Sequence, residues 1–242
     1  MKYGRLPKQE HPKTLRMAKY FDAILPNAHE KVYREYATPP SAKLMFGNDS
    51  YGDCVWAMMA NKIIHDSVHA GVVLIPTLDQ VLEAYSAVTG FNRQTGANDN
   101  GTVMVDALNY MQTTGIAGYK ILGWGQIDHT NRAHRNLGCD LFGCTLVGVN
   151  FPDTAMAEFS QGKSWTALDG DSDGGHAILR PGYGAAGDDY VTWARWDQKA
   201  SSAWSYAFVD EEYVCITQTW LDISKNASLK DSIWNDLKAL SQ

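Results

Sequence analysis

The spacing of hydrophobic residues changes character near residue 118. Before that point, apolar residues recur every three or four positions, which is the period of a helix with one buried face. The pattern predicts helices over about 54–70, 77–89 and 103–114, each followed directly by a glycine. Thr77-Leu78-Asp79-Gln80 also fits a capping box at the start of the second helix.

After residue 118, short segments rich in β-branched and aromatic residues predict strands. These segments are 119–122, 145–150, 176–180, 190–193, 203–208 and 213–217. A helix near 130–141 interrupts them, and a last helix over about 226–239 closes the chain. Since helices come first and strands afterwards, the order favours an α+β fold with a largely antiparallel sheet.

The chain of 242 residues suits one large domain. Residues 1–40 are polar and contain five prolines, so we predict an extended N-terminal arm that wraps the domain, with at most a short helix around 13–23. Residues 41–242 would form the single domain. Its parts would be a helical half (about 41–115), a β half (116–220) and a C-terminal helix (221–242).

Composition narrows the classes of partner. Hydrophobic residues make up 45% of the chain and charged residues 20%, which is ordinary for a globular protein. The net charge is −6 and no lysine or arginine cluster is dense, so we expect no nucleic-acid partner. No apolar run approaches the roughly 18 residues of a membrane-spanning helix, and no signal peptide is evident.

The four cysteines are too few for a disulfide scaffold in a chain of this length. We therefore expect free thiols in a reducing compartment, which would be the cytoplasm of a bacterial or phage-infected cell, with a virion as the other location.

Three motif matches point to no metal or cofactor. The GxGxxG match at 182–187 lies between two predicted strands, which favours a hairpin turn over a dinucleotide site. The acidic stretch at 169–174 fits half of an EF-hand loop, but Arg180 stands where the loop needs its glutamate, so a solvated acidic turn is favoured. A third pattern is a cysteine or histidine at every fifth position, at His129, His134, Cys139 and Cys144. An interval of five residues fits no zinc motif, so we expect buried cysteines and surface histidines.

Cys54 and His176 are the candidates for chemistry. Cys54 follows a Gly/Asp turn and begins an apolar helix, where free N–H groups and the helix dipole would lower a thiol pKa and would lie close to an oxyanion. His176 follows two glycines at the start of a strand, from which its ring could face a cleft. A cysteine and a histidine 122 residues apart fit a nucleophile–base pair that meets in space, whereas each alone fits a buried structural residue.

Both segments resemble the papain family of cysteine peptidases. Asn48-Asp49-Ser50-Tyr51-Gly52-Asp53-Cys54-Val55-Trp56-Ala57 resembles that family's Q-G-x-C-G-S-C-W-A, and Gly174-Gly175-His176-Ala177-Ile178 with the later Gly-Tyr-Gly resembles its N-H-A-V…G-Y-G. A set of bacterial and phage proteins of this type shares G-N-D-x-x-G-D-C, G-G-H-A-V and T-W-G. The resemblance runs from about residue 20 to 220.

The resemblance implies a papain-like fold and a role for each matched residue. Cys54 would be the nucleophile and His176 the base, Asn48 and the Cys54 N–H would hold the oxyanion, and Trp193 would shield the histidine. The family's orienting asparagine has no clear counterpart. One alignment puts Val191 at its position and a shift by one puts Thr192 there, and of the two only threonine could accept a hydrogen bond from the imidazole.

The leading hypothesis is therefore a cysteine peptidase or related amide hydrolase that acts on peptides or proteins and needs no cofactor. Acidic residues near His176 are predicted to border the cleft and to favour basic substrates; they are Asp169, Asp171, Asp173, Asp188 and Asp189. Two alternatives remain. One is a transglutaminase-like or deamidating acyl transferase, and the other is an inactive papain-like binding module, for example in a phage particle with a virion protein as partner.

Overall fold

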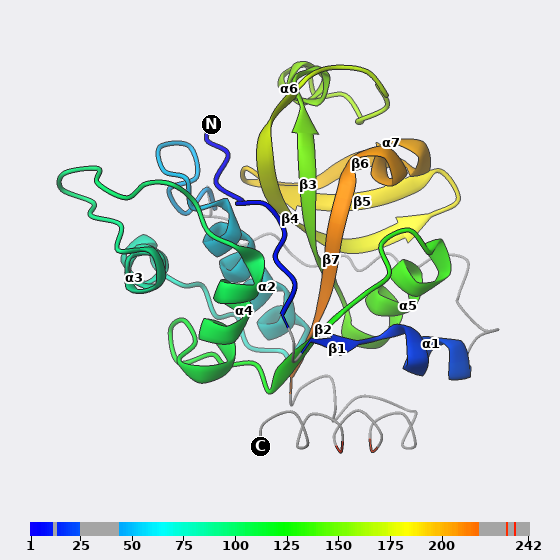
Figure 1. The fold of residues 1–242 in the computed structure, drawn as a ribbon, viewed down its shortest axis with the longest axis horizontal. Coiled ribbons are helices and arrows are strands. Elements are labelled where there is room, and N and C mark those ends of the chain that lie inside the picture. The colour runs from blue at the N-terminus through cyan, green and yellow to red at the C-terminus, as the bar shows by residue number, and fades with distance from the viewer. Residues whose placement is uncertain (12–13, 25–43, 218–230, 232–234, 236–242) are drawn as a thin grey trace.

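The computed structural model describes residues 1–11, 14–24, 44–217, 231 and 235 (Figure 1). Three helices form one half of the molecule, and they are α2 (Cys54–His69), α3 (Leu78–Thr89) and α4 (Met104–Thr113). A sheet and the remaining helices form the other half. The two halves meet where α2 packs against β4 (Ser172–Gly184) and β5 (Gly187–Thr192).

The sheet has seven strands in the order β1-β2-β7-β3-β4-β5-β6, with every neighbouring pair antiparallel except β1 and β2. The strands not yet named are β1 (Leu15–Arg16), β2 (Gly123–Gln126), β3 (Thr145–Pro152), β6 (Arg195–Ser201) and β7 (Val209–Ile216). This architecture confirms the predicted α+β class with a largely antiparallel sheet.

The three predicted helices of the first half are present, and their ends follow the sequence signals. Thr77 and Gln80 form the capping box in both directions at the start of α3, and Gly90 ends that helix with a positive φ of 73°. The first thirteen residues of α2 are all buried, because α3 and α4 cover one side of this helix and the sheet covers the other.

Around the sheet lie four further helices of the described chain. They are α1 (Ala18–Ile24), α5 (Arg132–Phe142), α6 (Asp153–Ser160) and α7 (Ser202–Phe208). The helix predicted near 130–141 is α5. Within the described residues, no helix is long and apolar enough to cross a membrane.

Two strand predictions were wrong. Residues 203–208 form α7, because Ser201 caps a helix by accepting a hydrogen bond from the Trp204 N–H, and this local cap outweighs the aromatic content of the segment. Residues 119–122 precede a strand that begins at Gly123. Gly125 of that strand has no room for a side chain, because a Cβ there would lie 2.4 Å from the sulfur of Met17. The helix predicted over 226–239 lies outside the described residues apart from residues 231 and 235.

The GxGxxG match and the cysteine and histidine series belong to ordinary local structure. Gly184 pairs with Gly187 across the turn between β4 and β5, so the GxGxxG match is a hairpin, as predicted. Cys139 and Cys144 are buried, also as predicted. The prediction of surface histidines was wrong for His134, which is buried and whose Nε2 lies 2.9 Å from the Asp22 carboxylate.

Candidate active site

Cys54 is the first residue of α2, and its side chain is buried between the two halves. Two backbone N–H groups face its sulfur, that of Ala177 in β4 and that of Gly4 near the N-terminus. The helix start, the sheet and the N-terminus of the chain therefore meet at this thiol.

His176 precedes Ala177 on β4, so the same strand brings the imidazole to the region of Cys54. Its Nε2 lies 2.8 Å from Thr192 Oγ1, while its Nδ1 makes no hydrogen bond to any described residue. When Nε2 carries the proton and donates to the Thr192 hydroxyl, Nδ1 has a free lone pair that can accept a proton. Of the two residues considered for the orienting position, Thr192 is the one that contacts the histidine.

Trp193 covers the imidazole. Its ring stacks on His176 with the centroids 4.2 Å apart and an angle of 14° between the planes. Trp193 and Ala194 form the two-residue turn between β5 and β6, and both have positive φ values, 44° and 61°. Such turns favour Asn-Gly, so Trp-Ala carries backbone strain of about 1 kcal/mol or more at each position. That conformation places the indole against the histidine.

Asn48 is buried in the turn before α2. Its side-chain amide donates to the Tyr51 carbonyl oxygen at 3.3 Å and to the Lys2 carbonyl oxygen at 3.2 Å. The second acceptor belongs to a chain segment that crosses the site, so this amide already binds a peptide carbonyl group there.

That segment, residues 1–6, is called the covering segment here. In Figure 1 it runs in dark blue along the line where the helical half meets the sheet. Backbone hydrogen bonds hold it to both halves. Thr102 donates to the Gly4 carbonyl (2.7 Å) and accepts from the Leu6 N–H (3.0 Å), and the Arg5 N–H donates to the Gly175 carbonyl at 3.0 Å. The covering segment therefore runs in extended form between the two halves, beside Cys54 and the strand that carries His176.

The covering segment fits closely because it contains one glycine, Gly4, and passes another, Gly175. A Cβ built on Gly4 would lie 1.9 Å from the Gly52 carbonyl oxygen, and one built on Gly175 would lie 2.2 Å from the Arg5 carbonyl oxygen. Tyr3 packs edge-on against Trp193. Sequence reasoning predicted an extended N-terminal arm and singled out the glycines before Cys54 and His176. It did not predict that the two meet, because no local pattern in residues 1–6 indicates a contact with residues so distant in the chain.

Burial keeps both members of the candidate pair neutral in this arrangement. Desolvation raises the pKa of the Cys54 thiol to about 12, although the N–H groups of Ala177 and Gly4 act in the opposite direction. Desolvation and the positive charge of Arg5 lower the pKa of His176 to about 3. A thiol and a neutral imidazole therefore face the covering segment near pH 7, and not a thiolate–imidazolium pair. Burial also raises the pKa of Asp53, the residue before Cys54, to about 8.

A surface hollow of about 590 Å³ is lined by Gly47 and Asp49, the residues on either side of Asn48 in the chain. It is lined by apolar side chains that include Phe46, Ile75 and Leu78, together with the polar residues Asp49 and Arg93. It lies on the side of the site where the covering segment begins, since the Lys2 N–H donates to the Asn48 carbonyl oxygen at 3.1 Å.

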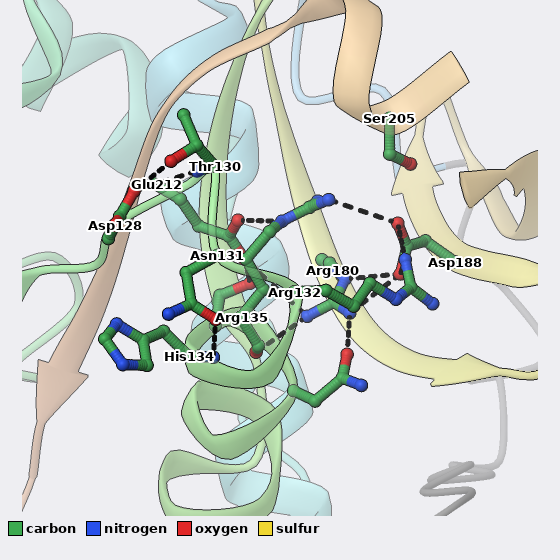
Figure 2. Close-up of polar contacts among 12 residues, drawn as sticks. Asp128, Thr130, Asn131, Arg132, His134, Arg135, Arg180, Asp188, Ser205 and Glu212 are labelled. Atoms are coloured by element: carbon green, nitrogen blue, oxygen red, sulfur yellow. Dashed lines mark hydrogen bonds and ion pairs between the residues drawn. The ribbon is translucent and has the colours of Figure 1, made fainter. Parts of the chain in front are cut away.

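The prediction that Asp188 and Asp189 border the cleft was wrong. Figure 2 shows Asp188 within a buried ion-pair network, where its carboxylate accepts from Arg180 at 2.7 Å and from Arg132 at 3.0 Å. Asp189 forms an ion pair with Lys199. Of the five predicted acidic residues, Asp173 approaches the covering segment, because it accepts a hydrogen bond from the Tyr3 hydroxyl at 3.3 Å.

The described residues contain one group with the composition of a metal site. Ligand atoms of His65, Asp66 and Cys144 lie within 4.8 Å of one another. However, the Lys62 ammonium lies 2.6 Å from the Asp66 carboxylate and already supplies the positive charge there. Tyr119 also donates to that carboxylate at 2.5 Å. This geometry fits a buried ion-pair cluster and not a divalent cation.

Comparisons with known proteins identify the fold. No family model and no curated protein sequence matches the chain. Among solved structures, xylellain, a cysteine protease from Xylella fastidiosa, covers 89% of this chain and 96% of its own, with a TM-score of 0.63 and 16% identity. The cysteine protease CMS1MS2 from Carica candamarcensis, solved with E-64, covers 78% and 99%, with a TM-score of 0.52 and 12% identity.

Procathepsin B S9 from Trypanosoma congolense covers 90% of this chain and 84% of its own, with a TM-score of 0.53 and 10% identity. These neighbours are papain-like cysteine proteases, and the papain-like fold predicted from the sequence is confirmed. At identities of 10–16% the likeness concerns the fold, so the chemistry has to be argued from the residues of this chain.

Proposed function

We propose that this chain is a cysteine peptidase in which Cys54 is the nucleophile and His176 the general base. The observation that carries the proposal is the bonding of His176. Its Nε2 is held by Thr192 at 2.8 Å while its Nδ1 is left without a partner among the described residues, on a strand whose next N–H group faces the Cys54 sulfur. The cysteine-protease neighbours support the same reaction class.

The proposed reaction proceeds in two acyl-transfer steps. His176 Nδ1 takes the thiol proton as Cys54 Sγ attacks the substrate carbonyl carbon, and the Asn48 amide and the Cys54 N–H stabilise the oxyanion. The C–N bond then breaks, and the leaving amine takes the proton from His176. In the second step His176 removes a proton from water, which attacks the thioester, and the acid product leaves as Cys54 recovers its proton.

Thr192 and Trp193 act as positioning residues in this scheme. The Thr192 hydroxyl fixes the ring by accepting from Nε2–H, and it stabilises the imidazolium more than the neutral ring because the hydrogen bond becomes charge-assisted. Stacked Trp193 keeps water from that face of the ring. No step requires a metal or an organic cofactor.

The covering segment must leave before a substrate can bind. It occupies the site with backbone hydrogen bonds to both halves, and both reacting groups are buried while it is in place. The described arrangement is therefore a dormant form of the proposed enzyme.

The test is hydrolysis of denatured casein by the full chain, followed by mass spectrometry of the products, in wild type and in Cys54→Ser and His176→Ala variants. Cys139→Ser is the matched control, since Cys139 is also a buried free thiol but lies in α5. We expect new peptide termini with wild type and Cys139→Ser alone, at a rate that rises when Gly4→Ala displaces the covering segment. Equal product from Cys54→Ser would refute the proposal.

Two outcomes would redirect it. Transfer of an added primary amine to glutamine side chains, without new peptide termini, would indicate the acyl-transferase alternative. No reaction even after displacement of the covering segment would favour the alternative of an inactive binding module. The observation that favours this alternative is that the covering segment closes the site. A bacterial or phage source is a further proposal that rests on the sequence motifs, and a cytoplasmic location, with a virion as the other, rests on the small number of cysteines, which are expected to be free thiols.

A further inference from the structure

Arg5 of the covering segment inserts its side chain into a pocket of the sheet half. Only 1% of that side chain is exposed. Its Nη1 donates to Glu211 Oε1 at 2.7 Å, and its Nη2 lies within 3.2 Å of three acceptors, which are Asp210 Oδ2, Asn150 Oδ1 and the Val149 carbonyl oxygen. A shallow surface contact would not supply four acceptors to one guanidinium group.

Two glycines make room for this side chain. A Cβ on Gly148 would lie 2.9 Å from Arg5 Cδ and 2.5 Å from Glu211 Cγ, and a Cβ on Gly175 would lie 3.2 Å from Arg5 Nε. Gly148 is on β3 and Gly175 on β4, so two neighbouring strands lack side chains where the arginine stem passes. The pocket is shaped for a long side chain with a planar end.

Charge makes the pocket selective for a cation. Glu211 is fully buried and Asp210 is 31% exposed, so two adjacent carboxylates face the same guanidinium group. The Tyr213 hydroxyl donates to Glu211 Oε2 at 2.7 Å and holds that carboxylate in place. An empty pocket, or an apolar occupant, would leave the Glu211 carboxylate buried without a counter-ion, which is strongly unfavourable. The spread of acceptors over two nitrogens fits guanidinium better than ammonium.

The pocket adjoins the reaction centre. Gly4, the residue before Arg5, places its N–H against the Cys54 sulfur, and the Arg5 N–H donates to Gly175, the residue before His176. Any extended chain that binds along β4 beside Cys54 therefore passes the mouth of this pocket.

We propose that the Arg5 pocket is the side-chain specificity site of the enzyme, that it selects an arginine of the peptide substrate, and that Arg5 occupies it in substrate-free protein. Glu211 is the main specificity-determining residue, with Asp210 and Asn150 completing the guanidinium site. This proposal rests on the peptidase function above, since it names the class of substrate for that same site. The acidic pocket, and not the acidic loops near His176, is then the reason for a basic substrate.

The binding part can be tested without catalysis. Arg5→Ala in the full chain empties the pocket, and N-acetyl-arginine amide is then titrated by calorimetry and by thermal unfolding, with N-acetyl-lysine amide and N-acetyl-norleucine amide as controls. We expect the arginine compound to bind and to raise the melting temperature of Arg5→Ala but not of wild type, with weaker binding of the lysine compound and none of the norleucine compound. Arg5→Ala/Glu211→Gln should lose the response.

Absence of any arginine-specific response in folded Arg5→Ala would overturn the proposal. If that variant does not fold, Arg5→Gln keeps a longer side chain without the guanidinium group, and the same titrations apply to it with the same expected order and the same refuting result.

Cleavage gives a second readout. Peptides that differ only in carrying arginine, lysine or norleucine at one position should differ in kcat/KM, with arginine favoured about 10- to 100-fold over norleucine, as expected for charged hydrogen bonds in a buried site. Glu211→Gln should remove most of this preference. Arginine-specific binding without any cleavage would refute the peptidase function and leave the pocket standing. Cleavage with equal kcat/KM for the three peptides would refute the pocket as a specificity site and leave the peptidase standing.

Discussion

Gly4→Ala should open the site by a single methyl group. In the closed arrangement the new Cβ would lie 1.9 Å from the Gly52 carbonyl oxygen and 2.6 Å from the Gly52 Cα. These are backbone atoms at the turn before α2, so no side-chain rotation relieves the overlap. The covering segment must move by about 1 Å or more to restore ordinary contact distances, and such a shift breaks the hydrogen bond between Gly4 and Thr102.

The magnitude follows from the cost of overpacking, which is about 1–3 kcal/mol. Because the open form does not bear this cost, the ratio of open to closed molecules should rise about 5- to 150-fold, at about 1.4 kcal/mol for each factor of ten. If alkylation of Cys54 proceeds through the open form, its rate should rise by the same factor. The wild-type thiol should react slowly below pH 9, since burial raises its pKa to about 12.

The assay is the rate of iodoacetamide labelling at Cys54 against pH, resolved by mass spectrometry, with buried Cys139 as the internal standard. Gly96→Ala is the matched control. Gly96 has a positive φ of 72° with no atom within 4 Å of its Cβ position, so alanine there strains the backbone by about 1 kcal/mol without touching the covering segment. Labelling of Gly4→Ala at the wild-type rate, or equal acceleration by Gly96→Ala, would refute the reasoning.

Three further predictions concern the residues around the pair. Thr192→Val should lower kcat/KM about 10- to 150-fold, because it removes a hydrogen bond to the imidazolium worth about 1.5–3 kcal/mol. Thr192→Ser keeps the hydroxyl and should retain most of the activity. Equal kinetics of the two variants would contradict the positioning role. The pKa of Asp53 is raised to about 8, so its contribution to stability is complete below its ordinary pKa and is lost as the pH rises through about 8. Urea unfolding at several pH values should therefore show that the free energy of unfolding falls more steeply with pH in wild type than in Asp53→Asn. Parallel curves would count against the raised pKa. Ala194→Gly should raise the free energy of unfolding by about 0.5–1 kcal/mol in thermal melts, because glycine adopts a φ of 61° without strain. Trp193→Gly should lower the free energy of unfolding, because the stacking on His176 is lost. Stabilisation by both variants would mean that the stacking contributes little.

The helical half was predictable because its signals are local. The capping box at Thr77 and the glycine at 90 fix the ends of α3 whatever the rest of the chain does. The sheet half was less predictable, since residues 203–208 have the composition of a strand and become helical through one cap at Ser201. Glycine at position 125 of strand β2 is explained by Met17, which packs against it and is distant in the chain.

The candidate pair could be named from sequence for a similar reason, because a cysteine at a helix start and a histidine after two glycines are each local features. The partner of the histidine could not be chosen between Val191 and Thr192, since the choice depends on the register of β4 against β5, which shifts between Leu179 and Gly182. A shift by one residue exchanges the two faces of a strand. The contacts of residues 1–6 were beyond reach because they join positions up to about two hundred residues apart along the chain.

Arg5 both anchors the segment that blocks the site and affects the pKa of His176. Its side chain anchors the covering segment in a buried acidic pocket, and its charge also contributes to the lowered pKa of His176. Departure of the segment would therefore do two things at once: it would free the place of the substrate, and it would return both Cys54 and His176 to water, where a charged pair is less costly. Steric blocking alone would predict that a small alkylating agent reaches the thiol with an ordinary pH profile. The electrostatic contribution predicts that the pH profile of labelling itself moves toward lower pH when the segment is displaced, which is why the pH dependence, and not only the rate at one pH, distinguishes the two.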